Sequence, residues 1–183
     1  MVPQVGSSRT KLIVLRANSG SGKSAIAAEL RGRYGRGIAI VGQDNLRRVV
    51  LRDRDRIGAA NIGLIGLTAR YALDHGFHVI IEGILYADRY SEMLLDLCRD
   101  HVGGSYLYYI DLPLAETLRR HATKPNSHEF GEAELTDWYR PQDLLPGGVE
   151  NIIGAENNLE DSVQRIVDET ALLADRVPEH ASL

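Results

Sequence analysis

The residues of this chain that could most plainly do chemistry form one glycine-rich run, Asn18-Ser19-Gly20-Ser21-Gly22-Lys23-Ser24. The run ends in Gly-Lys-Ser, as a phosphate-binding P-loop does. Gly20 and Gly22 allow the backbone to bend so that successive N–H groups point inward and hold phosphate oxygens. The Lys23 ammonium can bridge the terminal phosphates, and the Ser24 hydroxyl can ligate Mg²⁺. We therefore expect this run to bind ATP together with Mg²⁺.

One position departs from the strict P-loop pattern, which begins with glycine where this chain has Ala17. A Cβ is tolerated there if φ is negative. The alternative is an ordinary glycine- and serine-rich turn between a strand and a helix. The context favours the P-loop, because an apolar strand precedes the run and the helix that begins near Lys23 presents the positive end of its dipole to the anion. The pattern indicates nucleoside triphosphate binding and does not say how the triphosphate is used.

A second candidate group, Asp44 and Arg47, follows the next apolar strand. Phosphoryl transfer needs an acceptor in line with the γ-phosphate and a base on the acceptor hydroxyl. Asp44 is placed to be that base, and its alternative role is a helix N-cap. Arg47, one helical turn later, could bind a phosphate or carboxylate of the acceptor or could be a surface arginine. Arg48 points elsewhere on the helix and is the weaker candidate.

Glu82 ends a third apolar strand, Val79-Ile80-Ile81. A carboxylate at this place beside a P-loop serves Mg²⁺, a water on it, or the acceptor. The usual acid at this position is aspartate, and a structural hydrogen bond is the alternative. Asp111 also ends a strand, but Asp-Leu-Pro is a good helix start. Tyr86 could line an acceptor pocket or lie on a helix surface.

Arginines also flank a polar segment that could close over the triphosphate as a lid, at about 120–145. Arg120 precedes a loop, and Arg140 follows the short helix after that loop. A cation on a mobile lid would exclude water and stabilise charge in the transition state. An amphipathic helix pair with exposed charges is the alternative. The expected site residues are Lys23, Asp44, Arg120 and Arg140 for catalysis; Asn18, Ser19, Gly20, Ser21, Gly22, Lys23, Ser24, Ala25 and Arg120 for the nucleotide; Asp44, Arg47, Glu82 and Tyr86 for the acceptor; and Ser24 and Glu82 for the metal.

Alternating strands and helices must position these residues. We expect strands at 11–16, 38–42, 77–81, 105–110 and 149–153, and helices at 22–34, from 43, and at 57–75, 89–101, from 113, 132–139 and 158–174. This order predicts an α/β, three-layer P-loop NTPase fold: a five-stranded, mostly parallel sheet with helices on both faces and a small helical lid. Ligands then bind at the carboxyl ends of the strands, where the candidate residues lie.

Length and composition fit one compact domain. The chain has 183 residues, a net charge of −4 and no apolar run long enough to span a bilayer. We expect a flexible leader at 1–9, a single domain at 10–176 and a flexible tail at 177–183. The single cysteine, Cys98, fits core packing and a reducing cytoplasm, and the histidines show no zinc-ligand spacing. The stretch 31–56 is rich in arginine and could focus a field on phosphates, although Arg52, Arg54 and Arg56 read better as a solvated helix surface.

Together these residues resemble the small P-loop kinases that include zeta toxins, chloramphenicol phosphotransferase and the kinase domain of polynucleotide kinase. The resemblance spans 11–174 and rests on Gly20–Ser24, on Asp44-x-x-Arg47, on Val79–Gly83 and on the arginine-bearing lid. It implies that the aspartate after the second strand is the base, that the following arginine binds the acceptor and that lid arginines hold ATP phosphates. The Ile-Ile-Glu-Gly segment is similar to that of zeta toxins, which phosphorylate an activated amino sugar.

The expected activity is ATP-dependent transfer of the γ-phosphoryl group to a hydroxyl of a nucleotide sugar, nucleoside or antibiotic. A polynucleotide 5′-hydroxyl kinase is an alternative, but the acidic segment from 126 onward argues against a nucleic-acid backbone as the main partner. A GTP- or ATP-binding switch protein is the other alternative. The stretch 123–126 faintly resembles a guanine-reading Lys-x-Asp element, but Asn126 stands where that element has aspartate.

Overall fold

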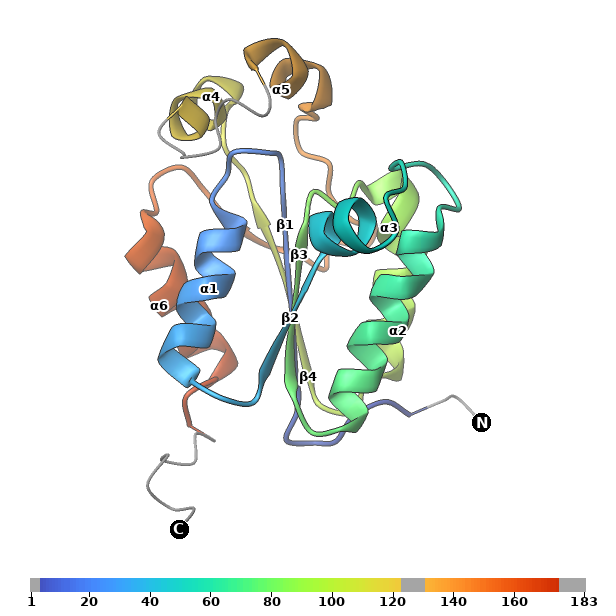
Figure 1. Cartoon of the computed structure of the whole chain (residues 1–183). Helices are drawn as coiled ribbons and strands as arrows, with labels where there is room; N and C mark the ends of the chain where they lie inside the picture. Colours follow the sequence, from blue (N-terminus) through green and yellow to red (C-terminus); the bar gives the residue numbers. More distant parts are fainter. Residues whose placement is uncertain (1–3, 123–130, 175–183) are drawn as a thin grey trace.

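The computed structural model describes residues 4–122 and 131–174, which form a five-stranded sheet between layers of helices (Figure 1). The strand order is β2-β3-β1-β4-β5, and every pairing is parallel. The expected α/β fold is therefore confirmed, with a sheet that is wholly parallel. The strands are β1 (Lys11–Ala17), β2 (Ile38–Gly42), β3 (His78–Gly83), β4 (Gly104–Ile110) and β5 (Asn151–Ile153).

Helices cover both faces of the sheet, and two more lie above its carboxyl end (Figure 1). On one face lie α1 (Lys23–Tyr34) and α6 (Leu159–Thr170), and on the other lie α2 (Ala60–Asp74) and α3 (Ala87–Asp100). The π-helix η1 (Asn45–Val50) follows β2 at the carboxyl end of the sheet. Above that end lie α4 (Leu114–Ala122) and α5 (Glu132–Trp138).

The core is split by the sheet into two hydrophobic clusters. Successive side chains of β1 alternate between them, with Ile13 and Leu15 on the α1/α6 side and Leu12 and Val14 on the α2/α3 side. All four are fully buried. A parallel strand covered on both faces needs this continuous apolar run, which is why the sequence pattern located β1 correctly. Cys98 packs against the α2/α3 cluster, as expected.

The segment after β2 differs from the expected regular helix. It forms the π-helix η1, whose i→i+5 bond from the Leu51 amide to the Leu46 carbonyl widens the turn. Arg52, Arg54 and Arg56 are solvent-exposed as expected, but they lie on an irregular loop and not on a helix. The next helix, α2, begins only at Ala60.

The structure describes residues 4–9 of the expected flexible leader. Val5 is buried, and its backbone pairs with that of His101 in a parallel bridge. Its N–H donates to the Asp100 carbonyl, and its own carbonyl accepts from Val102. Val5 therefore docks against the segment after α3, within the stretch that we expected to be a flexible leader. Among the described residues, no helix has the length and apolar character needed to cross a membrane.

Candidate active site

The turn between β1 and α1 has the geometry of a phosphate-binding loop. Gly20 and Gly22 have φ of 83° and 97°, a left-handed conformation that favours glycine. A Cβ on Gly20 would lie 2.6 Å from the Thr117 carbonyl oxygen of α4. The Ser21 hydroxyl is buried and lacks a hydrogen-bond partner among the described residues. No described side chain caps the start of α1, so the loop presents donors to an anion at a helix N-terminus.

The residues expected at the terminal phosphates and the metal lie together at this loop. The half-buried Lys23 folds back, and its ammonium donates to the Asn18 carbonyl at 3.3 Å. The Ser24 hydroxyl donates to Glu82 Oε2 at 2.9 Å. Glu82 reaches this place because it occupies the end of β3, the strand next to β1. A hydroxyl and a carboxylate oxygen that lie in contact are ligands that suit Mg²⁺. Their direct hydrogen bond also fits the alternative, in which Glu82 has only a structural role.

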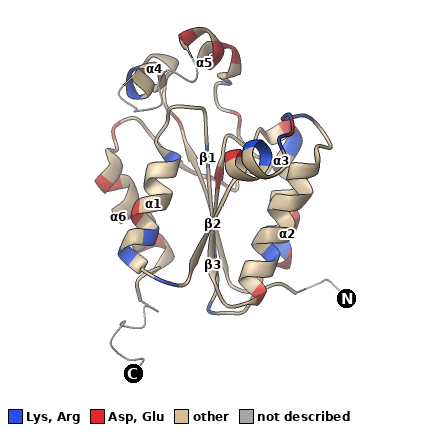
Figure 2. Cartoon of the chain, viewed as in Figure 1, with Lys and Arg blue, Asp and Glu red and all other residues tan. Residues whose placement is uncertain are grey.

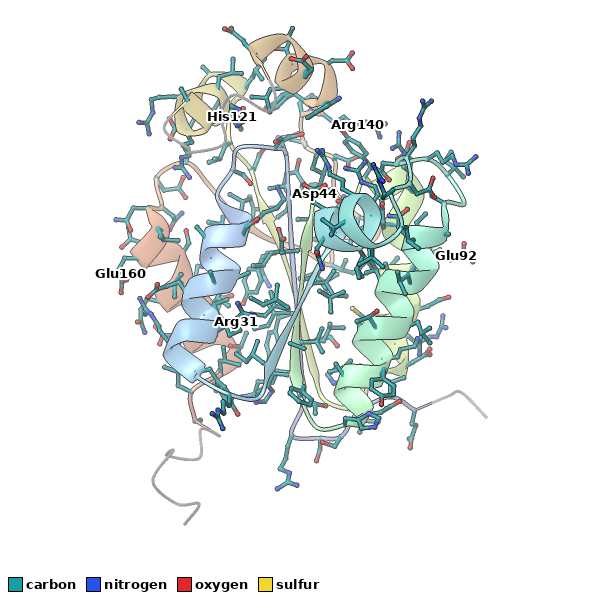
Figure 3. The ribbon with its side chains drawn as sticks, in the orientation of Figure 1. Arg31, Asp44, Glu92, His121, Arg140 and Glu160 are labelled. Atoms are coloured by element: carbon teal, nitrogen blue, oxygen red, sulfur yellow. The ribbon has the colours of Figure 1, made fainter. Side chains whose placement is uncertain are left out.

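Asp44 stands at the carboxyl end of the sheet, on the far side of β3 from the P-loop (Figure 3). Its side chain is 67% exposed and accepts from Arg47 Nη2 at 2.9 Å and from Arg48 Nε at 3.0 Å. Burial alone would raise the pKa of Asp44, but the Arg47 hydrogen bond and the charges of Arg48, Arg47 and Lys23 outweigh it and lower the pKa.

Two expectations for this helix need correction. Asp44 occupies the N-cap position of η1, but its side chain makes no capping hydrogen bond because both arginines take it. Arg48 does not point elsewhere: it binds the same Oδ1 atom as Arg47. Residues three and four positions along a helix both face the same residue, so the spacing Asp44-x-x-x-Arg48 was itself a signal.

The two lid arginines lie in different places. The Arg120 guanidinium donates to the Ser21 carbonyl at 3.3 Å and to Glu116 at 2.6 Å, so it contacts the P-loop. The Arg140 guanidinium lies 3.9 Å from the centre of the Tyr86 ring and pairs with Asp88 at 3.0 Å. Arg140 therefore lies beside Tyr86, a residue that we expected at the acceptor. The part of the lid between 123 and 130 lies outside the described residues.

Asn18 connects the P-loop to this second arginine. Its side-chain Oδ1 accepts from the Arg140 N–H at 2.9 Å, and its Nδ2 donates to the Arg140 carbonyl at 2.8 Å. The Asn18 side chain is buried, and both of its amide atoms are hydrogen-bonded to the Arg140 backbone. Only the Asn18 backbone could therefore make the nucleotide contact that we expected of this residue.

Two pockets flank the P-loop region. The first, here called the arginine pocket, has a volume of about 430 Å³, and the second, here called the α1/α6 pocket, about 320 Å³. The first is lined by Tyr86 and Arg47, the two residues that we expected at the acceptor. The arginine pocket is lined by Arg47, Arg48, Asp55, Ile84, Tyr86, Arg89, Asp137, Trp138 and Arg140, and the α1/α6 pocket by Ser21, Gly22, Ala25, Ile26, Ile110, Arg119, Arg120, Asn157, Asn158, Leu159 and Ser162.

The sequence analysis missed Arg16, a residue of β1 that lies just before the P-loop. Arg16 lies in β1 with no exposed surface, and it pairs with Glu150 at 2.7 Å and Asp143 at 3.0 Å. Its Nε donates to the carbonyl of Leu85, a residue with a positive φ of 49°. The signal was present, because a charged residue within an otherwise apolar buried strand requires buried partners.

The sequence analysis also gave no role to Arg89, which lies in the first turn of α3. Its Nη1 donates to the Asp55 carbonyl at 2.7 Å and pairs with the Asp55 carboxylate at 3.1 Å. The same carboxylate accepts from the Tyr90 hydroxyl at 2.7 Å, which itself accepts from Gln43 and Asn61. This buried network fixes the loop before α2 against α3 and so forms one wall of the arginine pocket.

No protein-family model and no curated protein matches the sequence. Solved structures do match the fold. APS kinase from Mycobacterium tuberculosis, solved with AMPPNP and APS, aligns with a TM-score of 0.67 and 20% identity over 94% of this chain and 99% of that one. A gluconokinase from Sinorhizobium meliloti gives 0.60 and 16% over 94% and 93%. The Deinococcus radiodurans tunicamycin resistance protein gives 0.61 and 15% over 88% and 95%. The chain therefore has the fold of the P-loop kinases.

Proposed function

We propose that this chain is an ATP-dependent phosphotransferase that moves the γ-phosphoryl group of ATP to a hydroxyl of a small molecule. The proposal rests on one observation: Asp44 and a pocket lie on the same side of the loop that contains Lys23 and Ser24. We assign Lys23 and Ser24 to the phosphates and the metal. A nucleotide-binding switch needs no acceptor pocket with a carboxylate at its border. The fold shared with several kinases supports the same class of reaction.

The nucleotide occupies the P-loop and the α1/α6 pocket. Backbone N–H groups of residues 19–25 hold the β- and γ-phosphates, and Lys23 neutralises their charge. The nucleoside lies in the α1/α6 pocket, which shares Ser21, Gly22 and Ala25 with the loop. Arg120 already touches the loop at Ser21 and is placed to stabilise charge on the phosphates.

The residues that would hold Mg²⁺ are Ser24 and Glu82, the latter directly or through water. Among the described residues, no group of three or more His, Cys, Asp or Glu side chains forms a metal cage. This donor set suits Mg²⁺, which keeps several waters and takes further ligands from substrate phosphates. When bound, the ion would neutralise negative charge on the phosphate oxygens.

Asp44 acts as the base on the acceptor. The acceptor hydroxyl oxygen attacks the γ-phosphorus, and the bond between the γ-phosphorus and the β,γ-bridging oxygen breaks. ADP leaves, and the hydroxyl proton passes to the Asp44 carboxylate. An aspartate is ionised at neutral pH, as this role requires, and the neighbouring arginines favour that form further by lowering the pKa of Asp44. Arg47 positions the acceptor, and in the protein without acceptor it binds Asp44.

Replacing Lys23 tests this function. Lys23→Ala should abolish ADP release and phosphoryl transfer in a screen of nucleosides, nucleotide sugars, sugar acids and antibiotics, while circular dichroism stays that of the wild type. The fold should persist because Lys23 is only half-buried and its ammonium donates to a carbonyl of the loop.

The matched control is Lys11→Ala at the opposite end of β1, where the ammonium donates to the Ala171 carbonyl. This variant should keep full turnover. Wild-type turnover in Lys23→Ala would overturn the P-loop assignment, and GTP-only binding without use of any acceptor would favour a switch protein.

A further inference from the structure

The arginine pocket has an unusual lining for a small-molecule site. Four guanidinium groups, from Arg47, Arg48, Arg89 and Arg140, face two lining carboxylates, Asp55 and Asp137. They come from η1, α3 and the segment after α5, so three parts of the fold converge on one space of about 430 Å³. Figure 2 shows positive residues on η1 and on the loop that follows it, at the same end of the sheet. A neutral ligand would need no such set of cations.

Part of this charge is held by carboxylates at the border. Asp44 takes one hydrogen bond each from Arg47 and Arg48, and Asp88 pairs with Arg140. Asp88 is exposed, and exposed ion pairs exchange readily because each contributes only about 0–1 kcal/mol. An anionic group entering the pocket can therefore replace these carboxylates on the guanidinium groups.

Two further guanidinium donors make no hydrogen bond. The Nε atoms of Arg47 and Arg89 are buried and have no hydrogen-bond acceptor among the described residues, although the Arg89 Nε lies 3.7 Å from the Asp88 carboxylate. Buried donors without acceptors are rare in folded proteins and mark places where a further partner is expected. Both belong to the lining of the same pocket.

Tyr86 fixes the orientation of this wall. The Arg140 guanidinium lies 3.9 Å from the centre of its ring and that of Arg89 lies 4.8 Å from it. The Tyr86 hydroxyl is itself held by the Trp138 carbonyl at 2.7 Å. Two guanidinium groups are thus held on one aromatic ring, a preorganised arrangement that suits bidentate recognition of an oxyanion.

We propose that the acceptor is an alcohol that also carries an anionic group, a phosphate, sulfate or carboxylate, which the guanidinium groups of Arg47, Arg89 and Arg140 hold in this pocket. The inference rests on the proposed function and narrows its acceptor. Anion binding by Arg47 loosens the Arg47–Asp44 pair, and Asp44 then becomes available to the acceptor hydroxyl at the pocket border. Neutral nucleosides and cationic antibiotics are disfavoured.

The experiment uses inorganic sulfate as a probe and needs no turnover. Trp138 is the one tryptophan of the chain and lines the pocket, so its fluorescence reports on occupancy. With ADP and Mg²⁺ filling the P-loop and ionic strength held constant with sodium chloride, sulfate should change the emission saturably. Calorimetry should give the same dissociation constant. Acetate in a parallel titration distinguishes a carboxylate site from one for a tetrahedral oxyanion.

Arg89→Gln and Arg140→Gln should each weaken binding of the preferred anion by about tenfold or more, the loss expected for one charge-assisted hydrogen bond. Arg99→Gln is the matched control, since Arg99 lies on the same helix as Arg89 but is 62% exposed and pairs with Asp96. It should bind as the wild type does.

The inference is overturned if neither anion gives a saturable response. It is also overturned if all variants bind with equal affinity, which would mean an adventitious ion only. An active enzyme that prefers neutral acceptors and shows no anion response rejects this inference alone. A normal anion response in a protein that transfers no phosphoryl group rejects the proposed function alone.

Discussion

At the scale of single residues, the chemistry depends on how Asp44 is held. The carboxylate is mostly exposed, and two arginines bind one of its oxygens. A base in this setting stays ionised at neutral pH but is weakened as a proton acceptor by the positive charge beside it. In the proposed complex, an acceptor that draws Arg47 away would make the carboxylate more basic. The arginines thus keep Asp44 charged in the resting protein and adjust its basicity in the complex.

Removing the charge of Asp44 should separate binding from chemistry. We expect Asp44→Asn to retain ATP affinity and to lower kcat by about 10²–10⁴-fold, the range for a lost general base. The melting temperature should change little, because the two ion pairs that are lost are exposed and contribute only about 0–1 kcal/mol each. Steady-state kinetics and thermal unfolding measure the two effects. Asp53→Asn on the neighbouring loop is the control, and a near-normal kcat in Asp44→Asn would move the base to Glu82.

The pH dependence of activity should show the effect of Arg47 and Arg48 on the pKa of Asp44. Because Arg47 and Arg48 lower the pKa of Asp44 below its usual value of 3.8, the carboxylate loses its charge only at lower pH, and the acid limb of kcat/KM shifts in the same direction. Arg48→Gln removes one of these charges, so the acid limb should move to higher pH. Profiles of the wild type and Arg48→Gln provide the test, and coincident acid limbs would show that another group controls the limb.

At the scale of elements, Asn18 and Arg140 join the nucleotide side of the site to the acceptor side. Asn18→Ala removes both hydrogen bonds that hold the Arg140 backbone. Since Asn18 is 4% exposed, we expect a loss of about 1–3 kcal/mol in unfolding free energy from the groups left unpaired. Misplacement of Arg140 should also weaken sulfate binding at the arginine pocket.

Urea unfolding and the fluorescence titration check these effects. Asn18→Asp keeps the acceptor oxygen for the Arg140 N–H and should recover part of the anion affinity. Asn157→Ala, a change at a half-buried asparagine of the α1/α6 pocket, should leave sulfate binding intact. Equal anion affinity in Asn18→Ala and the wild type would mean that Arg140 is positioned without Asn18.

The sequence predicted the single strands and helices well, but it predicted poorly the sites where several of them meet. Buried parallel strands are continuous apolar runs, so β1, β2 and β4 were found almost to the residue. The P-loop and its neighbour Glu82 were found because local spacing encodes them. Of the residues that line the arginine pocket, only Arg47 and Tyr86 were expected at the acceptor, because η1, α3 and the segment after α5 meet only in the folded chain. The π-helical turn of η1 also lacks a sequence period of its own.

At the scale of the whole molecule, β1 divides the site into two halves. On one side of it lie β3, which carries Glu82, and β2, which leads to Asp44 at the start of η1. On the other side lie β4 and β5. The arginine pocket and the α1/α6 pocket follow the same division, with the P-loop between them. This arrangement matches the general rule that ligands bind at the carboxyl ends of parallel strands. It also makes the stability of the site depend on what fixes the carboxyl end of β1.

Arg16 is the residue that fixes it. From inside β1 it binds the carboxylates of Asp143 and Glu150 and the carbonyls of Leu85 and Asp143. It therefore joins the central strand to the segment after β3 and to the segment after α5. Its guanidinium also lies 5.6 Å from the centre of the Tyr109 ring of β4.

Arg16→Met should lower the unfolding free energy by about 3–5 kcal/mol, because it leaves two carboxylates in place with their buried partner removed. Urea unfolding measures the loss. Arg99→Met, at an exposed site, should stay within about 0.5 kcal/mol of the wild type. Adding Asp143→Asn and Glu150→Gln to Arg16→Met removes the uncompensated charges and should restore part of the stability. A loss in Arg16→Met no larger than that of Arg99→Met would show that the carboxyl end of β1 is fixed by packing alone.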